Sequence, residues 1–93
     1  MQITVVRIGI LHEELPSVST LELKGACTLR GLIAQLDEGC GGGISRAMLD
    51  GGNVQDGVMI VINNRGLLSY PEGLDAPLKE GDRVTFTVML HGG

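Results

Sequence analysis

The chain has 93 residues, a net charge of −4 and only two aromatic residues, Tyr70 and Phe86. A chain of this length forms one small domain, here with an aliphatic core, and it leaves little room for a deep pocket with its catalytic groups. The seven basic residues are scattered and form no basic run beside aromatic residues, which argues against nucleic acid as a partner. No apolar run reaches the roughly 18–20 residues that cross a membrane, so no membrane partner is expected.

The first fourteen residues lack the features of a secretion signal. Arg7 interrupts the apolar run, and the run ends in His12-Glu13-Glu14 with no small-residue cleavage site. We therefore expect a cytoplasmic protein.

The two cysteines, Cys27 and Cys40, are too few for a secreted disulfide scaffold. Two reduced thiols are the plain interpretation, and a disulfide or redox pair is the alternative. A metal site that combines the cysteines with His12 and His91 has no recognised zinc-ligand spacing, so no metal is expected.

Two strands and a helix are predicted in the first half of the chain. Residues 2–10 are rich in β-branched side chains and residues 18–24 alternate apolar with polar, which predicts a hairpin. Thr28 is a candidate helix N-cap, and the apolar residues after it are spaced to form one helical stripe: Leu29, Leu32, Ile33 and Leu36. Gly39 is expected to end this helix.

The middle of the chain is glycine-rich. Residues 39–43 are expected to be a flexible connector, and residues 44–50 a short second helix that ends at residues 51–53. The glycine run resembles a phosphate-binding loop only superficially, because no Lys-Ser or Lys-Thr pair follows it.

Two further strands are predicted near the C-terminus. Residues 58–62 are continuously apolar, as in a central strand covered on both faces. Residues 63–66 and 70–73 carry turn signals. Residues 83–90 alternate, which predicts a strand with Val84, Phe86 and Val88 on one face and Thr87 and Met89 on the other.

These elements predict an α+β fold for residues 1–93 as a single domain. Four or five strands and one main helix bury their apolar faces when the sheet curls over the helix. If the first and last strands lie parallel at the centre of this mixed sheet, the fold is a β-grasp.

The C-terminal segment resembles the MoaD/ThiS family of ubiquitin-like sulfur carriers. Residues 73–84 read Gly-Leu-Asp-Ala-Pro-Leu-Lys-Glu-Gly-Asp-Arg-Val, close to a family run that leads to Gly-Asp, a short strand and a terminal Gly-Gly. The spacing from Gly81-Asp82 to Gly92-Gly93 matches that pattern without a gap. Residues 28–33 and 58–65 are similar to the family's helix start and its strand closing on Asn-Gly-Arg.

The chain departs from the family pattern in three places. Residues 39–57 are an insert with no counterpart. Asn64 stands where the family has a turn glycine, which the tolerance of Asn for left-handed backbone can explain. Thr87-Val88 replace a common Phe-Pro, and Met89-Leu90-His91 replace small residues before the glycines.

The resemblance implies that the working group is the C-terminal carboxylate of Gly93, on a flexible tail of residues 90–93. A ubiquitin-activating-type enzyme would adenylate it with ATP, and a cysteine desulfurase or rhodanese-like donor would convert it to a thiocarboxylate that gives sulfur to cofactor or metabolite biosynthesis. Gly92 would let the tail pass a narrow channel, because glycine has no side chain. The chain itself would bind no cofactor and would be a carrier, not an enzyme. It could also be the small subunit of a molybdopterin-synthase-like complex.

The residues near the tail are candidates for partner binding: Arg65, Thr87, Met89, Leu90 and His91. Each has a simpler interpretation, such as a core methionine, a solvated turn arginine or an exposed tail histidine. Two other functions stay open, namely a covalent protein modifier joined through Gly93 and a non-covalent β-grasp module in which the Gly-Gly is incidental.

Overall fold

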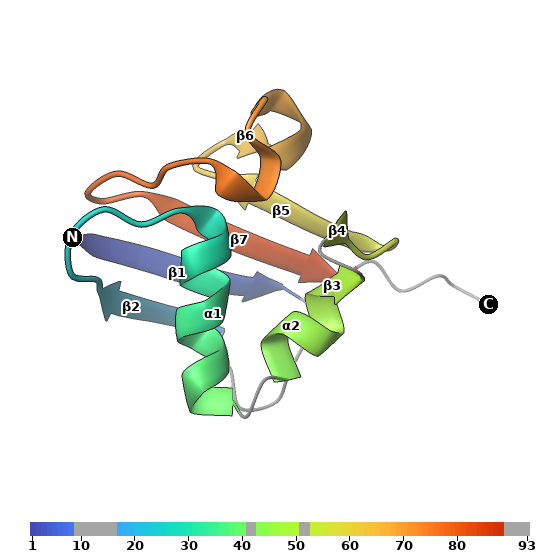
Figure 1. Cartoon of the computed structure of the whole chain (residues 1–93), viewed down its shortest axis with the longest axis horizontal. Coiled ribbons are helices and arrows are strands. Elements are labelled where there is room, and N and C mark those ends of the chain that lie inside the picture. Colours follow the sequence, from blue (N-terminus) through green and yellow to red (C-terminus); the bar gives the residue numbers. More distant parts are fainter. Residues whose placement is uncertain (9–16, 41–42, 51–52, 89–93) are drawn as a thin grey trace.

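The computed structural model describes residues 1–8, 17–40, 43–50 and 53–88 (Figure 1). A five-stranded sheet has the order β2-β1-β7-β5-β6, and β3 and β4 form a separate two-stranded hairpin. The strands are β1 (Gln2–Ile8), β2 (Val18–Glu22), β3 (Leu49–Asp50), β4 (Asn53–Val54), β5 (Val58–Ile62), β6 (Arg65–Gly66) and β7 (Arg83–Val88). The helices are α1 (Leu29–Cys40), α2 (Gly43–Met48) and the short 3₁₀ turns η1 (Leu67–Ser69) and η2 (Gly73–Asp75).

The first and last strands lie together at the centre of the sheet. They are parallel, with Val5 beside Val84 and Ile8 beside Thr87. β2 pairs antiparallel with β1, and β5 pairs antiparallel with β7. The β-grasp prediction is therefore confirmed.

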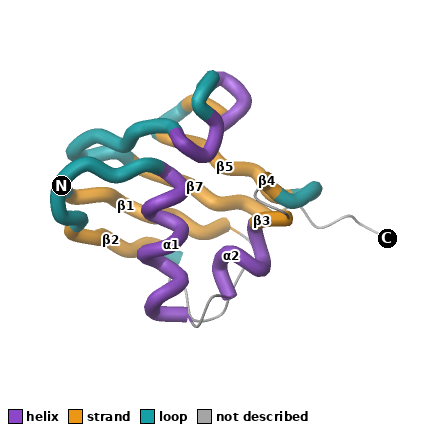
Figure 2. The backbone as a smooth tube through the Cα atoms, viewed as in Figure 1, coloured by secondary structure: helices purple, strands orange, loops and turns teal. Residues whose placement is uncertain are grey.

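One face of the sheet carries α1 and α2, as Figure 2 shows, and the core lies between the two layers. The predicted helical stripe points into this core, because all four of its residues are buried. The sheet contributes six further buried side chains: Ile3, Val5, Ile60, Ile62, Val84 and Phe86. Phe86 is the one aromatic side chain among the fully buried residues, so the core is aliphatic as expected.

The start of α1 follows the predicted capping pattern. The Gly31 amide donates to the Thr28 hydroxyl oxygen at 3.1 Å, which satisfies one of the free amides of the first turn. Gly31 also packs closely, since a Cβ atom there would lie 2.9 Å from the Cys27 sulfur. Close packing therefore explains why α1 contains a helix-weakening glycine.

The prediction of a flexible connector at residues 39–43 is partly wrong. Gly39 and Cys40 belong to α1, and Gly43 already begins α2, so the second helix runs over Gly43–Met48 instead of residues 44–50. Asp37 fastens the two helices together, because its carboxylate accepts the Ser45 amide at 2.8 Å and also the Ser45 hydroxyl. The β3–β4 hairpin that follows was not predicted, since strands of two residues show no periodicity.

Two details of the C-terminal half correct the sequence interpretation. β5 has the predicted bounds, but only one of its faces is covered: Ile60 and Ile62 are buried, whereas Met59 is 49% exposed. In the following turn the left-handed residue is Asn63, with φ of 57°, and not Asn64. Among the described residues, no helix is both long and apolar enough to span a membrane.

Candidate functional site

The predicted site begins where β7 ends. Five of its seven residues, at positions 89–93, lie outside the described residues: Met89, Leu90, His91, Gly92 and Gly93. The structure describes the platform from which they continue, up to Val88. Val88 lies opposite Val58 of β5, so this end of the sheet consists of β7 together with the beginning of β5.

Thr87 lies on the sheet face away from α1, as the alternation with buried Val84 and Phe86 requires. Its neighbours across the sheet are Ile8 on β1 and Met59 on β5. Ile8 and Met59 are 53% and 49% exposed, and Thr87 is half-buried between them. The row of Ile8, Thr87 and Met59, which we call the outer row, therefore presents apolar and hydroxyl groups with no charge.

Arg65 is not placed with Thr87. It lies in β6, where its guanidinium donates to the Ser69 carbonyl at 3.3 Å and stacks 4.8 Å from the centre of the Tyr70 ring. Tyr70 in turn donates from its hydroxyl to the Ile62 carbonyl at 3.4 Å. Arg65 thus braces its own loop by a cation–π contact, which gives it a structural role that the sequence did not reveal.

The two cysteines are too far apart for a disulfide. Cys27 precedes α1 and Cys40 is its last residue, and a twelve-residue helix is about 18 Å long, whereas disulfide-bonded Cα atoms lie within about 7 Å. Burial raises the pKa of the Cys27 thiol, whose sulfur contacts the Thr28 carbonyl at 3.2 Å. Within the described ranges, no three His, Cys, Asp or Glu residues are arranged to hold a metal ion.

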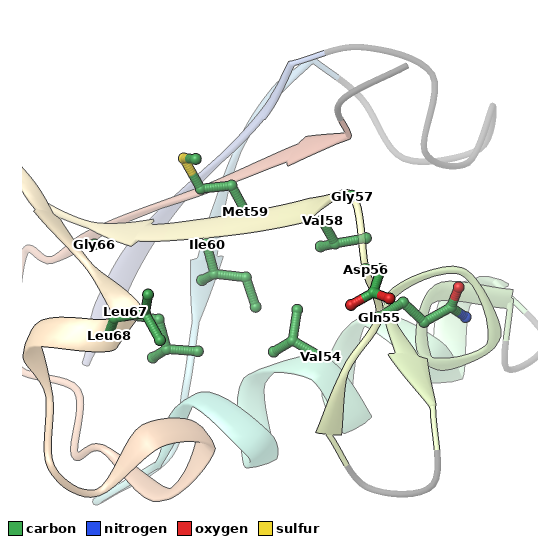
Figure 3. Close-up of a pocket in the computed structure, with 10 residues that line it drawn as sticks. All are labelled: Val54, Gln55, Asp56, Gly57, Val58, Met59, Ile60, Gly66, Leu67 and Leu68. Atoms are coloured by element: carbon green, nitrogen blue, oxygen red, sulfur yellow. The ribbon is translucent and has the colours of Figure 1, made fainter. Parts of the chain in front are cut away.

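A cleft that the sequence did not reveal lies beside β5 (Figure 3). Its volume is about 390 Å³, and its apolar wall consists of Val54, Val58, Ile60, Leu67 and Leu68. Asp56 is the one ionisable residue among those that line it. Val54 comes from the unpredicted hairpin and the two leucines from η1, so no sequence period connects them. We call this site the β5–η1 cleft.

The parallel β1–β7 pair, the single long helix across one sheet face and the chain that continues beyond β7 define a ubiquitin-like β-grasp domain. The sequence model of Urm1 (Ubiquitin related modifier) matches residues 9–93. The chain therefore belongs to the Urm1 family, which consists of ubiquitin-like carriers and modifiers and is not a family of catalytic enzymes.

Solved structures agree with this assignment. The chain is similar to one in the Amycolatopsis orientalis BexX/CysO complex, with 25% identity, a TM-score of 0.77 and coverage of 98% of this chain and 99% of the other. Mycobacterium tuberculosis CysO gives 25% identity, a TM-score of 0.73 and coverage of 95% and 99%. SAMP1 from Haloferax volcanii shares the fold at 17% identity, with a TM-score of 0.77 and full coverage of both chains. The comparison with curated proteins gives no match. The resemblance to MoaD/ThiS-like β-grasp carriers is thus confirmed.

Proposed function

We propose that the chain is a sulfur carrier whose reactive group is the carboxylate of Gly93. The observation that carries this proposal is the family match, which extends through the terminal Gly92-Gly93 pair to the last residue. The platform supports it, because β7, the strand that precedes these residues, is held between β1 and β5.

The chemistry needs a partner enzyme. A carboxylate is a poor electrophile, so an adenylating enzyme of the ubiquitin-activating type would join it to AMP from ATP and release pyrophosphate. The persulfide carried by a cysteine desulfurase or a rhodanese-like protein would then attack the acyl carbon and release AMP, and a thiol reductant would cleave the resulting acyl disulfide to leave the thiocarboxylate and the enzyme thiol. The resulting thiocarboxylate would donate its sulfur in cofactor or metabolite biosynthesis, either free or as the small subunit of a synthase. Gly92 would pass where a side chain would clash.

The partner enzyme would dock on the outer row and on the residues that follow β7. The row is uncharged and half-exposed, as in the centre of many protein interfaces. Met89, Leu90 and His91 would extend the contact toward Gly93, whereas Arg65 lies beside Ile62, at the other end of β5 from the end of β7. One similar structure is a complex of CysO with BexX, which supports the expectation of a protein partner for this chain.

The test is co-expression with each ubiquitin-activating-type enzyme of the source organism and a sulfur donor, followed by intact mass measurement. Replacement of one oxygen by sulfur raises the mass by about 16 Da. Deletion of Gly93 is the control and abolishes the shift. An unmodified carboxylate with every such enzyme would contradict the proposal.

A covalent modifier is the second candidate, favoured by the description of the family as ubiquitin related modifiers. It would use the same activated Gly93 but transfer the acyl group to a lysine amine, releasing AMP. Conjugates that survive reducing gels and vanish on deletion of Gly93 would support this role over sulfur transfer.

A further inference from the structure

The β5–η1 cleft has an apolar interior that is open at the surface. In Figure 3, Val54, Val58 and Ile60 point into it, whereas Met59 points to the other side of β5. Leu68 lies at its rim and is fully exposed. A single exposed leucine is ordinary, but one at the mouth of an apolar cleft extends a contiguous apolar patch, which is typical of interaction sites.

The cleft is already formed in the free chain. On one side, the Gln55 backbone amide donates to the Met48 carbonyl at 2.7 Å, and its side-chain amide donates to the Arg46 and Leu49 carbonyls at 2.7 and 3.0 Å. The Val58 amide closes a turn onto the Gln55 carbonyl at 3.2 Å, with Gly57 at φ of 86°. On the other side, η1 is closed by the Tyr70 amide on the Leu67 carbonyl at 2.9 Å. A preformed cleft lowers the ordering entropy that binding would otherwise cost.

The lining favours a peptide side chain over a small metabolite. Small-molecule sites hold several polar groups that converge on the ligand. Here Asp56 is the one charged lining residue, and the Gln55 amide nitrogen is already used within its own segment. An aliphatic side chain fits such an interior, and the Asp56 carboxylate together with the chain's net charge of −4 favours a basic neighbour beside it.

We propose that the β5–η1 cleft binds a short segment of a partner protein, with an aliphatic side chain in the cleft and a lysine or arginine beside Asp56. This gives a function to residues 54–57, which form one wall of the cleft. The cleft and the outer row share Met59, but the Met59 side chain points to the other side of β5, whereas those of Val54, Val58 and Ile60 point into the cleft. The proposal does not depend on chemistry at Gly93.

The probe is the synthetic peptide acetyl-Gly-Leu-Lys-Leu-Gly-amide, titrated into the ¹⁵N-labelled chain. We expect saturable amide shifts at Val54, Val58, Leu67 and Leu68. The matching peptide with Glu in place of Lys should bind about 2–5-fold more weakly, the range for an exposed ion pair and its reversal.

Two pairs of variants locate the site. Leu68→Ser should weaken peptide binding at least about 5-fold, because it removes apolar area that the peptide would cover at the mouth of the cleft. Val18→Ser, which removes another exposed aliphatic side chain from β2, should leave binding within about 2-fold. Asp56→Asn should weaken binding about 2–5-fold and abolish the preference for Lys over Glu, whereas Asp50→Asn on β3 should do neither.

Three results would overturn the proposal. The first is the absence of saturable binding, and the second is a shift pattern centred on the outer row or on β2. The third is a dependence of the same amide shifts on protein concentration without peptide, which would show that a second copy of this chain occupies the cleft. None of them bears on thiocarboxylate formation, so the two proposals fail independently.

Discussion

Val5 of β1 and Val84 of β7 lie side by side in parallel register, and both are completely buried. Two residues 79 positions apart in the sequence thus form the centre of the sheet, and the strand that holds the tail is anchored to the strand that opens the chain. The stability of this strand pair therefore depends on the core beneath β7.

Phe86→Ala should test this dependence. Phe86 is fully buried on β7, and truncation of such a side chain leaves a cavity, so we expect a loss of about 3–5 kcal/mol in the free energy of unfolding. Urea denaturation followed by far-UV circular dichroism measures it. Leu68→Ala, which truncates a fully exposed side chain, is the control and should change stability by less than about 0.5 kcal/mol. Equal losses in the two variants would show that Phe86 is not a core residue.

Thr28→Ala should remove the N-cap of α1. The lost acceptor for the Gly31 amide is expected to lower stability by about 1 kcal/mol. Thr28→Ser keeps the hydroxyl and should recover most of the loss in the same denaturation experiment. If serine is no better than alanine, the cap is not the cause.

Gly81 shows why the family's Gly-Asp pair is found before the last strand. Its φ is 82°, a left-handed conformation that disfavours side chains, although a Cβ atom would meet no other group. Gly81→Ala should therefore cost about 1–2 kcal/mol of stability from backbone strain alone. Gly66 has an ordinary φ of −63° and equally open surroundings, so Gly66→Ala should cost much less. A comparable loss for both glycines would contradict this explanation.

The sequence was sufficient to predict those helices and strands whose apolar residues recur at a regular spacing. The helical stripe from Leu29 to Leu36 and the alternation around Phe86 each indicate one buried face. The first and last strands are apolar, which favours a place for both at the centre of the sheet. These signals predicted the helix, β7 and the parallel pair.

The β5–η1 cleft could not be predicted in this way. Val54 belongs to a strand of two residues, and Leu68 belongs to a single 3₁₀ turn, so neither has a pattern to read. The second covered face of β5 was also predicted wrongly, because a continuously apolar strand predicts two covered faces, whereas Met59 on its outer face is 49% exposed among the described residues.

The Cys27 thiol should be slow to react. Burial raises its pKa, so the neutral thiol dominates near neutral pH, and alkylation by iodoacetamide in a Cys40→Ser background should be slower than for glutathione. The rate should rise with pH and should reach the free-thiol value in urea. Because the pKa is higher in the folded state, the stability that this neutral thiol contributes is present below its ordinary pKa and is lost as the pH rises through the raised value. A rate equal to that of glutathione in the folded chain would contradict the burial.

Thr87→Arg should test whether the adenylating enzyme docks on the outer row, because the substitution adds a charge to the surface and leaves the core unchanged. Thr87 lies on the outer face between Ile8 and Met59, so an arginine there would place a charge in the uncharged outer row and hinder the adenylating enzyme. If a co-expressed enzyme forms the thiocarboxylate on the unaltered chain, we expect at least about a 5-fold loss of that product with Thr87→Arg, as measured by intact mass. Thr20→Arg, on the same face but on β2, is the control for added charge and should keep the yield. An unchanged yield with Thr87→Arg would show that the partner docks elsewhere and approaches Gly93 without covering the outer row.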